Sequence, residues 1–486
     1  MSGSRLAAAR GVVWVVLESG GVSLLSLATL LVLARLIGPA EFGLAGLALS
    51  IVQVLYLVAE MLFHDALVQR RDLDDRHADS ALWASLLLGA GMAAGCWFLA
   101  PAAERLFEAP GLAPVLAWMG LSLVFGGANG VMTALLRRDL RFKRVAARSL
   151  FGRLAGAAAG LALALWGFGV WALVAQQIAM AAAATLALWI DPPRRPRLVL
   201  SLRHLRELLG FALPAFVASF LWQANLRLFV LIVGYLLGPA AVGYLTVAMR
   251  LVDTARMILG SALHQLALPL FSRRQDDREA LSRGFRQATE LTALVTQPLF
   301  AGLFALAPEV VALVLGPGWD PAVPLVRILC IVAMAQLVRQ FGNAALTAVG
   351  RPRWLAVQNA IGLAVSVALL VAFGEAGVVV AAAVWAARFV AVLPLNAWMV
   401  RVGAGVRWRD QFGPAALPVA GACLMAALLL AARLWLVPHW PALPALALLV
   451  PAGALFYLAL VLLIDRGPLA RLAAFAAAAL GRPAKA

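Results

Sequence analysis

The string IGPAEFG at residues 37–43 recurs as LGPAAVG at residues 237–243, 200 residues further along the chain. Each copy lies between two long apolar runs, at the same place in two blocks of similar length. Both copies have the same orientation relative to the predicted spans, so the pattern predicts a parallel repeat about an axis along the membrane normal. This repeat favours two lobes of six helices that face one central cavity.

The composition is typical of a polytopic membrane protein. Of the 486 residues, 64% are hydrophobic and only 13% are charged. Soluble domains have about 45–50% apolar and about 25% charged residues, and a membrane-spanning helix needs about 20 apolar residues. We therefore predict an all-α fold with about fourteen transmembrane helices. Their approximate ranges are 11–36, 42–68, 79–101, 112–136, 149–167, 169–190, 209–237, 241–270, 287–314, 322–349, 354–373, 376–400, 412–436 and 443–464.

The repeat divides these helices into three predicted parts. Residues 1–200 form an N-terminal six-helix lobe, residues 201–408 form a C-terminal six-helix lobe, and residues 409–486 add two helices and a tail. Two closely spaced pairs of spans depend on glycine turns at residues 166–169 and 374–377, because glycine allows the left-handed conformations that tight turns need.

The positive charges predict the orientation of the chain. Of 40 Lys and Arg residues, 30 fall in loops or tails on the side of the N-terminus, and only Arg35 and Arg105 fall near the opposite side. This bias predicts that both termini are cytoplasmic. Basic residues in short loops are also typical of contact with anionic lipid headgroups, so we expect no nucleic-acid binding despite the net charge of +17. The three cysteines share no metal-ligand spacing and are predicted to be small core residues.

Eight arginines lie inside hydrophobic segments, far from their ends. An arginine at the centre of a membrane helix costs roughly 2.5–3.5 kcal/mol on insertion, so these side chains are expected to face a cavity or acidic partners instead of lipid. A cationic interior indicates that an anion moves through the bilayer. The eight are Arg153, Arg227, Arg250, Arg256, Arg327, Arg339, Arg388 and Arg433.

Five ordered strings give the chain a resemblance to the bacterial polysaccharide flippases of the Wzx type, within the multidrug/oligosaccharidyl-lipid/polysaccharide flippase superfamily. They are ARLIGPAEFGLAGLAL (34–49), LLRRDLRFKRVA (135–146), GFGVWALVAQQ (167–177), LGPGWDPAVPLVRIL (315–329) and AVGRPRW (348–354). The resemblance implies two six-helix bundles with alternating access in the bacterial inner membrane. It implies an undecaprenyl-diphosphate-linked oligosaccharide as substrate, membrane lipids as surroundings, and polymerase or other polysaccharide-assembly proteins as partners.

With that substrate, the deep arginines become candidate ligands of the diphosphate, because a guanidinium can donate two parallel hydrogen bonds to phosphate oxygens. Arg227, Arg250, Arg256 and Arg339 are expected to line the cavity, and Arg153 and Arg388 are candidates to complete the ring. We expect local structural roles for Arg327, near Asp320 and Glu309 in the sequence, and for Arg433. Arg227 stands where relatives more often have an acidic residue or Asn, which puts an ion site there in doubt.

Four acidic residues are candidates for coupling transport to H⁺ or Na⁺, since buried carboxylates can carry protons between leaflets. They are Glu18, Glu60, Asp65 and Asp253. Two alternatives stay open: Glu60, His64 and Asp65 could form one satisfied polar cluster, and Asp253 could neutralise Arg250 at i,i+3. We expect no cofactor and no metal centre.

Two other functions compete with flipping. An ion-coupled drug exporter of the same superfamily should have an acidic pocket for organic cations, whereas the deep charges here are mainly arginines. A polysaccharide polymerase or glycosyltransferase should have a substantial extramembrane loop, but the longest outer loop covers only residues 102–111. No nucleotide-binding glycine loop is present, so we expect a transporter and not an enzyme.

Overall fold

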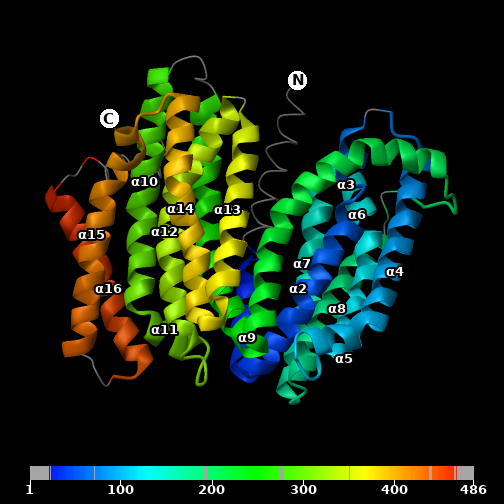
Figure 1. Ribbon diagram of the computed structural model, residues 1–486, viewed down its shortest axis with the longest axis horizontal. Helices are drawn as coiled ribbons and strands as arrows, with labels where there is room; N and C mark the ends of the chain where they lie inside the picture. Colours follow the sequence, from blue (N-terminus) through cyan, green and yellow to red (C-terminus); the bar gives the residue numbers. More distant parts are fainter. Residues whose placement is uncertain are drawn as a thin grey trace. The chain divides into compact units, whose positions relative to one another are not determined.

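The computed structural model describes residues 21–464, apart from residues 22, 71, 191, 193, 273–277, 350 and 437–439, and also residue 467. All regular secondary structure in these residues is helical, which confirms the predicted all-α class (Figure 1). The chain divides into two compact units, residues 1–247 and 248–486. The predicted lobe boundaries after residues 200 and 408 stay predictions, as does the cytoplasmic placement of the termini.

The first unit contains a short apolar helix over Ser23–Leu36, followed in its described residues by seven further helices before α9. They are α2 (Pro39–Met61), α3 (His64–Gln69), α4 (Asp75–Leu106), α5 (Leu112–Gly120), α6 (Ser122–Arg138), α7 (Phe142–Leu165) and α8 (Val170–Trp189). The long α9 (Leu202–Ser272) begins in this unit and continues into the second, with non-helical backbone at Gly238 (φ 79°).

The second unit contains the remaining helices. They are α10 (Arg278–Ala305), α11 (Ala307–Val314), α12 (Ala322–Ala348), α13 (Pro352–Phe373), the 3-10 turn η1 (Gly374–Ala376), α14 (Val378–Ala404), α15 (Trp408–Trp435) and α16 (Ala442–Ile464). The predicted glycine turns occur where expected, because Gly167, Gly169 and Gly377 all have positive φ between consecutive helices.

The predicted count of fourteen spans is not confirmed. In the described part of the chain, eleven helices are long and apolar enough to cross a membrane, or up to twelve if the bent pair α10 and α11 forms one span. The first predicted span, 11–36, falls largely outside the described residues. The predicted seventh and eighth spans fall within the single element α9, of which only Arg227–Met257 qualifies as a candidate span.

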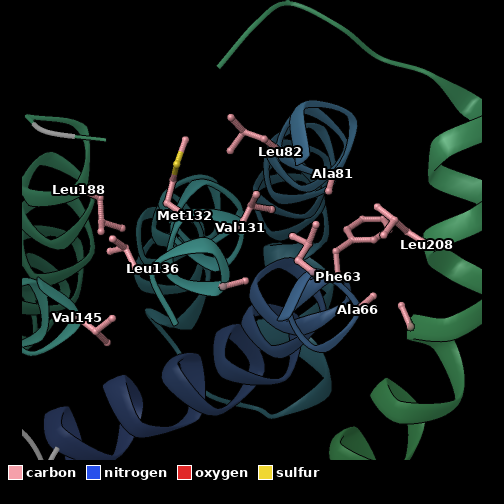
Figure 2. Close-up of a cluster of buried hydrophobic side chains, with 13 residues drawn as sticks. Phe63, Ala66, Ala81, Leu82, Val131, Met132, Leu136, Val145, Leu188 and Leu208 are labelled. Atoms are coloured by element: carbon pink, nitrogen blue, oxygen red, sulfur yellow. The ribbon is translucent and has the colours of Figure 1, made fainter. Parts of the chain in front are cut away.

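Small residues allow the helices of the first unit to approach closely. Gly152, Gly156 and Gly160 repeat every fourth residue along α7 and face α8, where added Cβ atoms would lie about 2.9–3.0 Å from side chains of that helix. Such small-residue stripes replace the hydrophobic effect as the basis of helix packing in lipid. A cluster of buried side chains, including Phe63, Leu82 and Leu208, joins α3, α4, α6, α8 and the start of α9 (Figure 2).

The two copies of the repeated string contact each other within the first unit. A Cβ added to Gly43 would meet the Pro239 carbonyl group and lie 2.9 Å from the Gly243 nitrogen. Conversely, a Cβ added to Gly243 would meet the Pro39 carbonyl group and lie 3.1 Å from the Gly43 nitrogen. Corresponding residues thus make the same contact in both directions, which is what a two-fold relation between the two copies requires.

In the second unit, α10 packs against α12 and α15, and α14 packs against α12 and α13. A buried apolar cluster that includes Leu294, Met425 and Tyr457 attaches α15 and α16 to α10. Arg433 forms an ion pair with Glu309 of α11, and Arg327 donates to the Phe304 carbonyl oxygen at 3.2 Å. Both arginines therefore have the local contacts that we expected of structural residues, although Glu309 pairs with Arg433 and not with Arg327.

Candidate functional site

Arg339 of α12 and Arg388 of α14 share one aromatic neighbour inside the second unit. Their guanidinium carbons lie 5.6 Å and 4.4 Å from the centroid of the Phe389 ring, and that of Arg388 lies 3.5 Å from the Trp385 centroid. The two positive charges are close enough to repel each other. The aromatic faces offset part of the desolvation cost of each cation. Two half-buried cations on one aromatic platform are suited to an anion with two negative charges.

Amide side chains lie beside Arg339. Asn396 of α14 donates to Asn343 of α12 at 3.1 Å and to Gln358 of α13 at 2.7 Å. Arg339 and Asn396 line the same small hollow together with Gln411. The side-chain nitrogen of Gln340 is buried and has no hydrogen-bond partner. Because amides exchange hydrogen bonds readily with hydroxyl groups, the neighbourhood of the arginine pair has the donors and acceptors that a sugar needs.

A second polar group joins α9 and α12. Arg256 lies 2.9 Å from the Asp253 carboxylate and donates to the Gln336 side chain at 2.7 Å. Asp253 pairs with Arg256, three residues after it, and not with Arg250. The alternative that Asp253 neutralises Arg250 is therefore wrong. Arg250 itself is exposed. Gln336 and Arg339 are one turn apart on α12, so this group continues toward the arginine pair.

Arg227 and Arg153 belong to the first unit, and the structure does not place them relative to Arg339. Arg227 lies half-buried on α9. Arg153 lies on α7, close enough to Tyr56 of α2 for electrostatic interaction. Of the six predicted anion ligands, the structure therefore brings Arg339 and Arg388 together, and Arg256 bonds to Gln336, one turn before Arg339 on α12.

The first unit contains a buried polar cluster around Glu60 of α2. Arg148 of α7 lies 3.8 Å from the Glu60 carboxylate and donates to the Thr133 hydroxyl of α6. The buried Asn129 side chain lies next to Tyr56 of α2, and Nε of Arg148 is buried without a hydrogen-bond partner. Buried polar groups are nearly always satisfied, so the Arg148 side chain has a donor available for a further acceptor. Glu60, Arg148 and Asn129 thus form a second candidate site.

Asp65, another predicted coupling residue, lies just after the helix that holds Glu60. The turn after Met61 separates α2 from α3, where the His64 imidazole lies 3.1 Å from the Asp65 carboxylate. His64 is also close enough to Glu60 for electrostatic interaction, so Glu60, His64 and Asp65 are neighbours, with Arg148 as the ion-pair partner of Glu60. Glu18 lies outside the described residues.

Arg148 is the residue that sequence reasoning missed. We counted it among the loop charges because hydropathy begins the span at residue 149, whereas α7 begins at Phe142. The available signal was its spacing, since Arg148, Gly152 and Gly156 recur every four residues and share one face of the helix. A charge on the small-residue face of a membrane helix points to a packed partner and not to water.

Comparisons with known proteins agree with this architecture. A family model described as "Polysaccharide biosynthesis protein" matches residues 32–324. The succinoglycan biosynthesis transport protein ExoT of Rhizobium meliloti is 29% identical over 66% of this chain. The lipopolysaccharide biosynthesis protein WzxC of Escherichia coli is 24% identical, also over 66%. Each alignment covers 65% of the relative's own length, so the chain matches somewhat under two thirds of these curated proteins.

Solved structures with low sequence identity share the fold. The lipid II flippase MurJ, in an inward closed conformation, superposes with a TM-score of 0.75 at 14% identity, over 97% of this chain and 100% of that one. An inward-facing multidrug transporter of the MATE family superposes with a TM-score of 0.61 at 15% identity, over 79% of this chain and 94% of that one.

Proposed function

Because this chain belongs to the polysaccharide biosynthesis protein family, we propose that it is a flippase and not an enzyme. Its substrate is an oligosaccharide linked to undecaprenyl diphosphate. The protein moves this lipid from the cytoplasmic to the periplasmic leaflet of the bacterial inner membrane, with both termini cytoplasmic. The product serves the synthesis of O-antigen, capsule or exopolysaccharide, with polymerase and other assembly proteins as partners.

The observation that supports this proposal most strongly is the pairing of Arg339 with Arg388. Hydrogen bonds to charged groups contribute about 1.5–3 kcal/mol each, and arginine meets phosphate oxygens with two donors at once. A diphosphate placed over the shared Phe389 ring relieves the repulsion between the two cations. An organic cation would increase this repulsion, and for this reason we prefer an anionic substrate to the drugs of the exporter alternative.

The rest of the substrate follows from the surrounding chemistry. Sugar hydroxyls exchange hydrogen bonds with the amides of Gln340, Asn343 and Asn396. The polyprenyl chain stays in lipid, because each CH₂ group costs about 0.8 kcal/mol to expose to water. The protein therefore has to enclose only the diphosphate and the sugars.

We place ion coupling at the Glu60 cluster of the first unit, with H⁺ or Na⁺ as the ion. Protonation of Glu60 removes its attraction for Arg148, which lies 3.8 Å away, and frees that guanidinium to change partners. A Glu60→Gln variant imitates the protonated state. It should transport without response to an imposed pH gradient, whereas an Asp65→Asn variant should keep the response.

The test is export in a strain that lacks the chromosomal copy of this gene. Arg339→Gln and Arg388→Gln should each reduce surface polysaccharide about tenfold or more, since about 1.4 kcal/mol corresponds to a factor of ten. Lipid-linked oligosaccharide should accumulate inside the cells. Arg401→Gln, an exposed change near the end of the same α14, is the matched control. Full export by the double variant Arg339→Gln/Arg388→Gln, at wild-type protein levels, would exclude the proposed anion site.

A further inference from the structure

Three leucines are exposed where the segment after α8 meets the first residue of α9. Leu198, Leu200 and Leu202 have relative exposures of 87%, 52% and 79%. Three such side chains within five residues form a compact apolar patch, and exposed apolar patches mark contact with a partner or a membrane. We refer to residues 194–203 as the linker and to these three side chains as its leucine patch.

Hydrogen bonds from α4 hold the linker backbone in place. The Asp79 carboxylate accepts from the Arg197 backbone nitrogen at 3.1 Å, and the Trp83 indole donates to the Arg197 carbonyl oxygen at 2.8 Å. The Ser80 hydroxyl accepts from the Ser201 backbone nitrogen at 2.9 Å. Hydrogen bonds from α4 hold the backbone at both ends of the stretch from Arg197 to Ser201. The exposed direction of the leucines is therefore set by ordered contacts of the backbone.

A second group of contacts fixes the start of α9. Glu207 lies 2.8 Å from Arg70 and 3.2 Å from His77, and the bond from Arg70 is the main reason that its pKa falls to about 2. The backbone nitrogen of Asp74 donates to Nδ1 of His77, which leaves Nε2 to donate to Glu207.

A metal ion at this place would conflict with that hydrogen bonding. Asp74, His77 and His204 have ligand-type atoms within 4.8 Å of one another. A metal on Nε2 of His77 would require a proton on Nδ1, which already accepts from Asp74. The hydrogen bonds of His77 attach the start of α9 to α4.

Arginines surround the leucine patch and determine which partner suits it. Arg195, Arg197, Arg203 and Arg206 are all exposed. Apolar side chains flanked by arginines are typical of segments that lie in the membrane interface, with the cations at anionic headgroups. An apolar side chain is also exposed further along α4, because Leu87 is 62% exposed one turn beyond the anchoring residue Trp83.

We propose that the linker is a membrane-interface anchor: Leu198, Leu200 and Leu202 insert into the leaflet at this end of α4, while the four arginines bind anionic phospholipid headgroups. Hydrogen bonds from α4 hold the linker backbone, and the bilayer is the partner of its exposed side chains. The anchor holds the start of α9 on the first unit at a fixed depth. This inference needs only a bilayer and does not depend on the proposed substrate.

Site-directed spin labelling of the full-length protein in liposomes tests the proposal. Single cysteines replace Leu198 or Leu202 in a background without Cys96, Cys330 and Cys423. Glu279→Cys, whose native side chain is 89% exposed on a charged helix start, provides the aqueous reference, and Leu87→Cys provides the lipid reference. Collisions with molecular oxygen and with a water-soluble nickel chelate are measured in phosphatidylcholine liposomes with and without phosphatidylglycerol.

We expect labels at 198 and 202 to collide with nickel at least threefold less often than the label at 279, and with oxygen nearly as often as the label at 87. Removal of phosphatidylglycerol should raise the nickel collisions at both positions at least twofold. Nickel access equal to that at 279 overturns the anchor. Protection from both reagents, in detergent as well as in liposomes, shows that protein covers the patch and also overturns it. No response to phosphatidylglycerol overturns the role of the arginines.

Discussion

The reciprocal contact of the two repeated strings makes Gly43→Ala a sensitive test of the structure. The added methyl group would meet the Pro239 carbonyl oxygen and lie 2.5 Å from its carbon, whereas carbon atoms in contact lie about 3.5–4.0 Å apart. The two backbones must therefore separate by about 1 Å. Overpacking of this kind costs typically 1–3 kcal/mol, and both obstructing atoms belong to the backbone, which cannot turn aside as a side chain does.

Thermal unfolding of the purified protein in detergent, followed by aggregation or tryptophan fluorescence, measures this cost. Gly38→Ala is the matched control, because its φ is −67° and nothing lies within 4 Å of the added atom. We expect a clear drop in the melting temperature for Gly43→Ala and almost none for Gly38→Ala. Gly243→Ala should resemble Gly43→Ala, because it meets the Pro39 carbonyl group in the same way.

The double variant gives the sharpest result. Once one methyl group has forced the two strings apart, the second meets less resistance, so the combined loss should be smaller than the sum of the two single losses. If Gly43→Ala and Gly38→Ala melt at the same temperature, or if the two glycine changes add in full, the two strings are not in contact and the two-fold relation fails.

Two further predictions concern ion pairs. Since Arg70 holds the pKa of Glu207 at about 2, below its unfolded value of about 4.3, the stabilising contribution of Glu207 is complete above about pH 4.3 and is lost as the pH falls through about 2. Hydrogen exchange of residues 197–207 should therefore rise only below about pH 4.3, and Glu207→Gln should abolish that pH dependence; an unchanged profile in the variant contradicts this. Arg433→Leu should cost about 3–5 kcal/mol in unfolding experiments, because it leaves the 13%-exposed Glu309 carboxylate alone, while the added change Glu309→Leu should restore most of the loss. Equal losses in the single and double variants would show that the pair itself stabilises the protein.

Glycine and hydropathy made most of the helices predictable. The span predicted at 443–464 agrees with α16 (Ala442–Ile464), and the turn around Gly377 separates α13 from α14 as expected. These features depend on local chemistry, since a run of apolar residues must be helical in lipid and a positive φ favours glycine. Helix ends were less predictable, because hydropathy detects the part of a helix inside the hydrocarbon, whereas α4 and α7 continue into the charged flanks.

The partners of the deep charges could not be derived from the sequence. Arg433 pairs with a residue 124 positions away, and Glu60 pairs with Arg148, which we had placed in a loop. Asp253 has arginines at both i−3 and i+3, so spacing alone could not choose between them. Such choices depend on which helices pack side by side, and the periodicity of each helix does not specify this. The sequence identified the deep arginines as a group but did not single out the pair that shares Phe389.

The most direct test of the proposed function is transfer of lipid-linked oligosaccharide in liposomes that contain the purified protein, under an imposed ion gradient. Membrane-impermeant periodate oxidises sugars only in the outer leaflet, so the rate at which protected substrate becomes reactive measures flipping. We predict that the wild-type protein and Arg401→Gln flip the lipid at similar rates, and that Arg339→Gln/Arg388→Gln is slower by at least tenfold. Equal rates for all three proteins, or a wild-type rate no higher than that of protein-free liposomes, would contradict the proposal that this chain moves an anionic glycolipid over a paired arginine site.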